Sequence, residues 1–347
     1  MSVATSGQPI GPARVGPIGW LLAILVLAVA LVAGLLVGSV DIDPLGSIGV
    51  ILDLIPGVET HHGLNEIEQR VILEIRAPRV AMGAIVGAVL AVAGAGYQGV
   101  FRNPLADPYL LGVAAGAGLG ATFVFAFDGA SGVVPILAFA GGLAAVALTY
   151  ALGKSVGGRT TTSLILAGVA VAAFATAIQT FLLQRNLDTL REVYSWILGR
   201  LVTVGWGEVR TLLPYAVVAS VVLLLHGRLL DVLGLGDDEA EALGVRVIRV
   251  RRFVVLAATL ATAAAVSVSG LIGFVGLIVP HTVRMLTGWS YRVIIPLSIV
   301  YGAAFLVVAD LIARTAAAPA ELPIGVVTAF LGAPFFVLVL RTMRGPQ

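Results

Sequence analysis

The chain has 347 residues, of which 59% are hydrophobic and only 12% are charged, and its mean hydropathy is +1.04. Soluble domains carry roughly 25% charged residues, so this composition excludes a soluble protein and predicts one that lies largely in lipid. Cysteine is absent, which excludes disulfides, thiolate metal sites and cysteine nucleophiles. The net charge of +2, without a basic cluster that contains aromatic residues, argues against nucleic-acid binding.

Ten stretches are apolar enough to span a membrane as helices, each of which needs about 20 predominantly apolar residues. The first lacks a convincing cleavage site, so we expect a retained span after a cytoplasmic tail, residues 1–16, and not a signal peptide. The eighth is short and interrupted by Gly273, Gly276 and Pro280, which leaves nine spans as the alternative. The predicted spans are residues 17–40, 79–101, 109–127, 133–153, 162–184, 208–228, 253–269, 272–287, 292–315 and 322–342.

The distribution of charge predicts the orientation of these spans. With the N-terminus inside and ten alternating spans, the inner segments hold 13 Arg and Lys and 6 Asp and Glu, whereas the outer segments hold 8 and 12. An excess of basic residues is typical of the cytoplasmic side. The sequence therefore predicts an all-α polytopic membrane protein with a single transmembrane domain, residues 17–347, and both termini in the cytoplasm.

Three segments outside the spans are predicted to be partly helical. Residues 41–78 lie outside and end in an amphipathic helical lead into the second span. Residues 185–207 contain a short surface helix. Residues 230–252 lie inside, where an acidic helix start complements the helix dipole. The apolar face of the lead comprises Ile67, Val71, Ile72 and Ile75.

Glycine is abundant, at 42 residues, and much of it lies within the spans. Small residues let membrane helices approach closely, because lipid provides no hydrophobic drive for their association. The runs GAIVGAVLAVAGAG (83–96) and AGAGLGA (115–121) therefore predict tightly packed helices.

Only a few polar side chains are candidates for a catalytic, proton-carrying or metal-binding role. Asp310 lies deep within an apolar run, where acids are costly and are usually functional or paired; an ion pair with Arg314, one helical turn later, is the plain alternative. His281 is either a proton relay or a packed helix-end residue. His61 and His62 are adjacent on an outer loop without a third spaced ligand, so we expect a solvated loop and not a metal site.

Enzymatic functions are disfavoured by missing partners. A membrane aspartyl protease needs two intramembrane Asp residues, and the predicted spans contain only one, Asp310. No phosphate-binding loop of the Walker type occurs, so this chain is not expected to hydrolyse ATP. A proton-coupled secondary transporter that uses Asp310 and His281 is the alternative function, although no clear repeat of the kind that would support it is present.

Four blocks of sequence, in order along the chain, resemble the permease subunits of the iron-siderophore, haem and vitamin B12 class of ABC importers. They cover nearly all of the chain from about residue 70 onward. The blocks are RAPRVAMGAIVGAVLAVAGAGYQGVFRNPLADPYLLGVAAGAGLGA (76–121), SLILAGVAV (163–171), GLIGFVGLIVPHTVRM (270–285) and ELPIGVVTAFLGAPFFVLVL (321–340).

The resemblance implies a type II importer permease in the cell membrane, with ten spans and both ends inside. Such a permease translocates a metal chelate, here cobalamin, a ferric siderophore or haem, by alternating access. The implied partners are a second copy of the chain, two ABC ATPase subunits and an extracytoplasmic solute-binding protein. ATP and Mg are used by the ATPase subunits, and this chain is expected to bind no cofactor or metal.

The resemblance also assigns roles to residues at both faces of the membrane. Inside, GDDEAEALGV (236–245) matches the family's coupling segment, where a short helix and a Gly dock in a cleft of the ATPase. Outside, three Arg match positions that face acidic groups of the binding protein, which Arg binds through bidentate pairs. The coupling residues are Asp237, Asp238, Glu239, Ala240, Leu243 and Gly244, and the docking residues are Arg76, Arg79 and Arg314.

Between these faces the resemblance implies a cytoplasmic gate and a central pathway. Thr161 and Thr162 match the gate, where relatives place small hydroxyl residues. The pathway runs along the fifth and tenth spans, whose few charged residues suit a bulky chelate that must not be held. The matching pathway residues are Thr176, Gln179, Thr180, Thr328 and Phe330.

The stretch GVFRNPLADPYLLGVAAGAG (99–118) interrupts the apolar pattern between the second and third spans. Pro104 and Pro108 donate no backbone hydrogen bond and disfavour helical geometry in the residues before them, so the second span should end near Asn103. Arg102 fits the cytoplasmic side. We expect a structural elbow here, with a part of the inner gate as the alternative.

Overall fold

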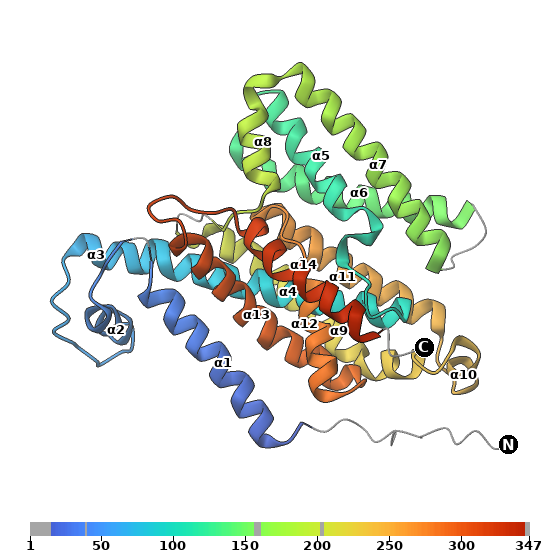
Figure 1. Ribbon diagram of the computed structural model, residues 1–347, viewed down its shortest axis with the longest axis horizontal. Helices are drawn as coiled ribbons and strands as arrows, with labels where there is room; N and C mark the ends of the chain where they lie inside the picture. The colour runs from blue at the N-terminus through green and yellow to red at the C-terminus, as the bar shows by residue number, and fades with distance from the viewer. Residues whose placement is uncertain (1–14, 39, 156–160, 202–204, 344–347) are drawn as a thin grey trace.

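A computed structural model describes residues 15–38, 40–155, 161–201 and 205–343, and the regular elements in this part of the chain are all helical (Figure 1). The predicted tail therefore lies almost wholly outside the described residues. The helices are α1 (Pro17–Leu36), α2 (Pro44–Leu52), α3 (Glu66–Arg70), α4 (Ala77–Phe101), α5 (Val113–Ala126), α6 (Val134–Ser155), α7 (Thr161–Arg185), α8 (Leu190–Ile197), α9 (Gly207–Leu233), α10 (Asp237–Ala242), α11 (Val247–Ser269), α12 (Val275–Thr287), α13 (Tyr291–Thr315) and α14 (Ile324–Met343).

Each of the ten predicted spans contains one of these helices. Within the described residues, seven helices are long and apolar enough to cross a membrane, and two further apolar ones are shorter: α5 and the part of α14 that ends at Val339. The helix of the eighth span, α12, has 13 residues and carries Pro280. The prediction of an all-α polytopic protein is confirmed, and the eighth span is as short as its glycines and proline indicated.

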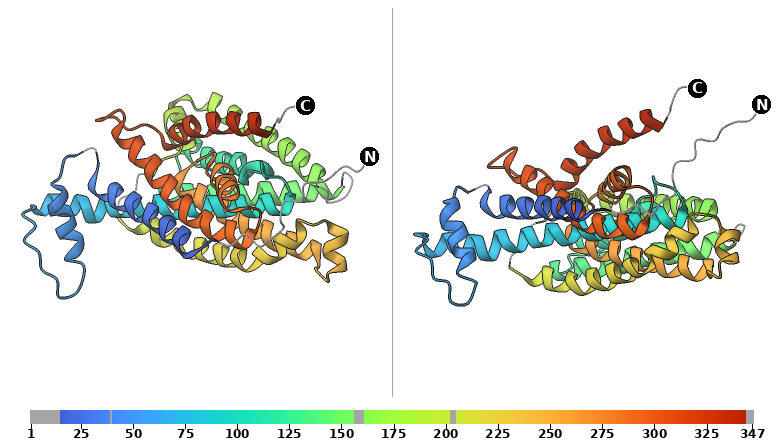
Figure 2. Two further views of the ribbon diagram at one scale, coloured as in Figure 1. Left: turned by 60° about the horizontal axis from the view of Figure 1, so that its bottom comes forward. Right: turned by 90° about the horizontal axis from the view of Figure 1, so that it is seen from below.

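The second span, α4, forms the centre of the bundle. It packs against α9, α11, α12 and α13, while α5, α6 and α7 pack together beside this group and α1 lies on α13. Figure 2 shows α2 and α3 at one end of the molecule and α10 at the opposite end. This arrangement agrees with the charge distribution, which places α2 and α3 outside and α10 inside.

Glycines allow the helices around α4 to touch backbone to backbone. A methyl group added at Gly94 would lie 1.9 Å from the carbonyl oxygen of Gly276 on α12, and one at Gly87 would lie 2.2 Å from that of Gly302 on α13. Contacts this close leave room only for hydrogen on the α-carbon. The tight packing predicted for residues 83–96 is therefore confirmed.

The amphipathic lead into α4 is helical, but its predicted apolar face is only partly buried. Ile72 is fully buried, whereas Ile67 is 75% and Ile75 is 47% exposed. The cause is a π-helical turn, Val71–Arg76, between α3 and α4. A π turn has a longer repeat than an α-helix, so the periodicity used to assign one face does not hold across it.

The helix predicted within residues 185–207 is α8, but one side of this helix is buried. Val193 and Trp196 are buried, and Trp196 packs in a small cluster with Val266 and residues of α5 and α6. The residues directly after α8 reach α11 and α14: the backbone N–H of Arg200 donates to the carbonyl of Ser269, and that of Gly325 donates to the carbonyl of Leu198.

Candidate functional site

The short helix α10, at the end of the molecule opposite α2 and α3, is held between two glycines with positive φ angles. Gly236 precedes it at φ 137° and Gly244 follows it at φ 80°, values that other residues adopt only with strain. Ala240 is fully buried against the main core cluster, whereas Asp238 and Glu239 are exposed. One face of α10 is therefore fixed to the bundle and the other is open.

The open face combines acidic and apolar groups. Leu243, at the C-terminal end of α10, is 64% exposed, and Leu235, just before the helix, is 62% exposed. Acids in the first turn are favourable at the positive end of the helix dipole. A surface of this kind, apolar in part and acidic in part, is suited to contact with another protein.

Asp237, the first residue of α10, is turned toward the helix bundle. Its Oδ1 lies 2.8 Å from Nη2 of Arg251 on α11 and 3.3 Å from Nη2 of Arg102, directly after α4. We call Arg102, Asp237 and Arg251 the inner ion cluster. The predicted coupling residues thus divide in two: Asp237 and Ala240 hold α10 in place, and Asp238, Glu239, Leu243 and Gly244 are exposed.

At the opposite end, Asp310 on α13 binds two arginines. Its Oδ1 lies 2.9 Å from Nη2 of Arg79 on α4, and its Oδ2 lies 3.1 Å from Nε of Arg314, an ion pair that lacks hydrogen-bond alignment. Nη1 of Arg79 also lies 2.9 Å from Glu321, just before α14. These four residues form the outer ion cluster. The predicted pair of Asp310 and Arg314 is confirmed, and Arg79 completes it.

Two of the three arginines expected to dock a binding protein are buried. Arg314 is 3% exposed and Arg76 is 4% exposed. Arg76 donates to the carbonyl oxygens of Leu35 and Leu36, and Arg314 donates to that of Gly34, so both satisfy the unpaired carbonyls at the end of α1. The structure therefore does not present Arg76 or Arg314 to a partner, and docking at Arg79 stays a prediction.

The two residues predicted to form the gate lie at the N-terminus of α7. Thr161 is the first residue of this helix. Its side chain and residues 156–160 lie outside the described part of the chain. Thr162 is exposed. The gate therefore stays a prediction.

The predicted pathway residues face in different directions. Gln179 is buried and its Nε2 donates to Thr122 Oγ1 of α5 at 3.0 Å, and Thr328 is fully buried and donates to the carbonyl of Gly325. The side chains of Gln179 and Thr328 therefore lie on the buried sides of their helices. Thr176 and Thr180 are exposed on α7.

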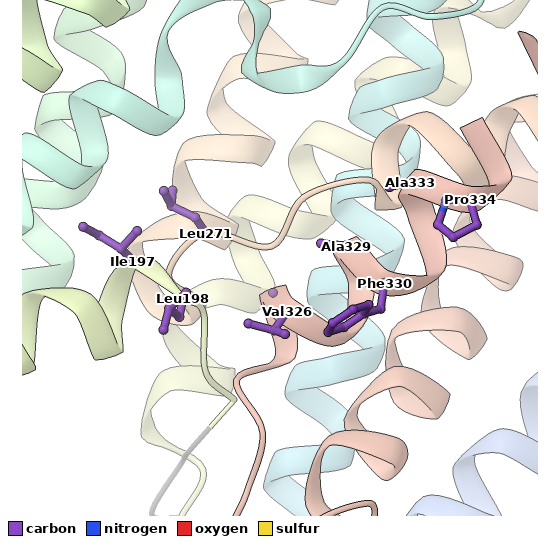
Figure 3. A pocket seen from close by; sticks show the side chains of 9 residues that line it. Ile197, Leu198, Leu271, Val326, Ala329, Phe330, Ala333 and Pro334 are labelled. Atoms are coloured by element: carbon purple, nitrogen blue, oxygen red, sulfur yellow. The ribbon is translucent and has the colours of Figure 1, made fainter. Parts of the chain in front are cut away.

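A cavity of about 570 Å³ lies between the end of α8 and the first half of α14 (Figure 3). Phe330, one of the residues predicted to line the pathway, borders it and is 77% exposed. Among the described residues that line the cavity none is charged. They are Ile197, Leu198, Leu271, Gly325, Val326, Ala329, Phe330, Ala333 and Pro334.

Buried polar contacts between distant helices were not predicted from the sequence. Gln98 on α4 is fully buried, and its Oε1 accepts a 2.8 Å hydrogen bond from Arg284 on α12. Asp231 on α9 accepts hydrogen bonds from Ser290 Oγ and from the backbone N–H of Tyr291, and so caps α13 from another helix. No local pattern marks such pairs, because their partners are 59 to 186 residues apart.

The histidines show no metal site. His62 Nε2 lies 3.4 Å from Asp53, and the backbone N–H of Leu64 donates to its Nδ1. Within the described residues no group of three His, Cys, Asp or Glu is arranged to hold a metal ion. His281 packs edge-on against Phe335 of α14, as the packed alternative expected.

Comparison with known proteins adds an independent line of argument. The FecCD transport family matches residues 25–342. The cobalamin import system permease protein BtuC of Halobacterium salinarum is 44% identical over 281 residues, covering 80% of this chain and 75% of that protein. The Fe(3+)-citrate import system permease protein YfmD of Bacillus subtilis is 37% identical over 326 residues, covering 94% and 95%.

A solved structure resembles this one over nearly the whole length of the chain. An inward-facing conformation of a metal-chelate type ABC transporter superposes with a TM-score of 0.83 at 28% identity, covering 94% of this chain and all of that one. Family match, relatives and helical architecture thus agree over nearly the whole chain. The chain therefore belongs to the FecCD transport family and is a multi-pass permease of the cell membrane.

Proposed function

We propose that the protein is the membrane permease of an ABC importer for a metal chelate, working as a pair of identical chains with two ATPase subunits inside and a solute-binding protein outside. The observation that carries this proposal is the geometry of α10. It is a short cytoplasmic helix, fixed to the bundle by buried Ala240 and by the ion pairs of Asp237, with a partly acidic and partly apolar face left open.

That geometry suits a helix that receives force from another subunit. A docking element must be open on the side of its partner and must be attached firmly to the part that it moves. Leu243, at 64% exposure, supplies the apolar contact, and Asp238 and Glu239 supply charge. The glycines at both ends set the angle of α10 without side chains that would obstruct a cleft.

The cavity beside α14 supports translocation of a bulky ligand. Its volume of about 570 Å³ lies within the roughly 300–1,000 Å³ of small-molecule sites. Its uncharged lining offers no ion pair that would retain a ligand. We place the pathway along this side of α14, with Phe330 at its wall, and a second copy of the chain closes it from the other side.

The substrate class follows from the same lining. The relatives named above import cobalamin and Fe(3+)-citrate, and a conduit without fixed charges discriminates little between chelates. We propose cobalamin and ferric chelates as the candidate substrates, with the choice made by the binding protein.

The competing mechanism, proton coupling through Asp310, is disfavoured by the outer ion cluster. A proton-carrying carboxylate must be able to become neutral, and for Asp310 this would break its ion pairs with Arg79 and Arg314. Protonation of Asp310 would leave Arg314, at 3% exposure, without its acidic partner.

Reconstituted transport tests the proposal. The permease, its ATPase and its binding protein are placed in proteoliposomes, and uptake of labelled cobalamin and of ferric siderophores is measured side by side. We expect uptake of one of them to require ATP and to continue in the presence of an uncoupler. Uptake that proceeds without ATP and stops with the uncoupler would refute the proposal in favour of a secondary transporter.

A further inference from the structure

The elbow, residues 102–112, has a shape fixed by its own hydrogen bonds. Arg102 ends α4 in a left-handed conformation, at φ 49° and ψ 36°. The side chains of Asn103 and Asp107 each accept a hydrogen bond from the backbone N–H two residues later, at 2.9 and 2.8 Å. Such Asx turns hold the backbone in one conformation, so we expect the elbow to move as one piece.

The elbow also touches three other helices, α6, α7 and α12. Its contacts are close: a methyl group added at Gly168 would lie 2.2 Å from the carbonyl of Leu110. A displacement of the elbow therefore cannot be absorbed locally and must move its neighbours. These contacts join Pro108 to Gly276 on α12, Tyr109 to Ile272 before α12, Leu111 to Thr149 on α6, and Leu110 to Gly168 on α7.

Arg102 is the residue of the elbow that reaches α10. Its Nη2 lies 3.3 Å from Asp237 Oδ1, the same oxygen that Arg251 binds. Arg251 belongs to α11, the helix into which the chain continues after α10. The pair with Arg251 is therefore a contact between sequence neighbours, whereas the pair with Arg102 connects α10 to a different part of the bundle.

We propose that Arg102 is a positioning residue that links α10 to the elbow, so that a displacement of α10 is delivered through Asp237 and Arg102 to α6, α7 and α12. The inference rests on the proposed function, because it takes α10 as the contact for the ATPase. It gives the elbow a mechanical role: the elbow packs on Gly168, within two turns of Thr162 and the predicted gate.

Two features favour transmission over a passive surface ion pair. The backbone at Arg102 is fixed by the left-handed turn and by the Asx turn that follows, so the position of its side chain depends on the elbow. Asp237 is the first residue of α10 and directly follows Gly236, so a shift of α10 displaces Asp237 directly.

The test measures uptake and ATP hydrolysis together in proteoliposomes that contain the complete transporter. With Arg102→Gln we expect the number of substrate molecules imported per ATP to fall by about five-fold or more, while the ATPase still co-purifies with the permease. Arg102→Lys keeps the charge and should restore the ratio. The matched control is Arg249→Gln, which removes an exposed Arg of α11 that lies outside the inner ion cluster.

A covalent link provides an independent test, because the chain contains no cysteine. In the double variant Arg102→Cys and Asp237→Cys, a bifunctional thiol-specific reagent of about the length of the ion pair replaces the electrostatic contact. We expect the unlinked double variant to be uncoupled, as Arg102→Gln is, and the cross-linked form to regain import per ATP.

The outcomes separate this inference from the proposed function. If the unaltered complex imports no chelate with ATP, the proposed function fails. If it does, and Arg102→Gln imports as many molecules per ATP as Arg249→Gln, the link through Arg102 is refuted. A cross-linked form that stays as uncoupled as the unlinked one would equally refute it.

Discussion

The two ion clusters of this permease are built from the same parts but differ in burial. In the outer cluster, the side chains of Asp310 and Arg314 are 2% and 3% exposed; in the inner cluster, those of Arg102 and Asp237 are 42% and 38% exposed. A buried pair cannot be opened without leaving an uncompensated charge, whereas an exposed pair exchanges readily with water.

The difference in burial indicates a division of labour. The outer cluster joins α1, α4 and α13 to the segment before α14 through fixed contacts, which suits the static end of a bundle. The inner cluster joins α10 to the elbow and to α11 through partly exposed contacts, which suit an end of the bundle that moves together with α10. We infer that movement within one copy of the chain is concentrated at the cytoplasmic end, and the following changes test this view.

The largest effect is expected from Asp310→Asn. This change leaves the buried Arg314 without its carboxylate and Arg79 with Glu321 alone, and breaking a buried ion pair destabilises a protein by about 3–5 kcal/mol. Thermal unfolding of the purified permease in detergent should show a much lower midpoint. Asp237→Asn is the matched control, and an equal loss of stability in both variants would contradict the comparison.

Gly94→Ala should have the next largest effect. The added methyl group would lie 1.9 Å from the carbonyl oxygen of Gly276, and overpacking of this kind costs about 1–3 kcal/mol. The matched control is Gly273→Ala, since a methyl group there meets nothing within 4 Å. If both variants unfold at the same temperature, the close contact of α4 with α12 does not limit stability.

Leu243→Asp should weaken the complex without affecting the permease alone. Because Leu243 is 64% exposed, the unfolding temperature should not change. If Leu243 enters the cleft of the ATPase, loss of its apolar contact should lower the affinity by about 1–2 kcal/mol. Binding of the ATPase to immobilised permease measures this, and unchanged binding would remove Leu243 from the contact.

The smallest effect is expected from Glu321→Gln at the rim of the outer cluster. Its side chain is 36% exposed, and exposed ion pairs contribute about 0–1 kcal/mol. The change frees Nη1 of Arg79 while the pair with Asp310 persists. If Arg79 docks the binding protein, affinity for that protein should rise. Arg79→Glu is a poorer test, because it would also place a carboxylate beside Asp310.

Local patterns predicted the parts of this molecule that are governed by neighbours in sequence. The ten apolar runs each contain a helix, the prolines end α4 near Asn103, and Asp310 pairs with Arg314 four residues later. The charge distribution assigned α2 and α3 to one side of the membrane and α10 to the other, and these helices do lie at opposite ends of the molecule.

The sequence could not predict contacts between distant segments or the exact face of a helix. Arg79 and Asp310 are 231 residues apart, so neither indicates the other. The π turn after α3 shifted the face of the amphipathic lead. Gln179 and Thr328 are buried, with hydrogen bonds to Thr122 and to the carbonyl of Gly325, and their place on the pathway stays a prediction.

Distances between spin labels test the division of labour most directly. In the cysteine-free chain, one pair of cysteines replaces exposed residues at the inner end, Asp238 on α10 and Arg292 on α13, and another replaces exposed residues at the outer end, Glu74 before α4 and Thr315 on α13. We expect ATP to change the inner distance in the complete transporter and to leave the outer distance unchanged. An outer distance that changes as much as the inner one would contradict the account.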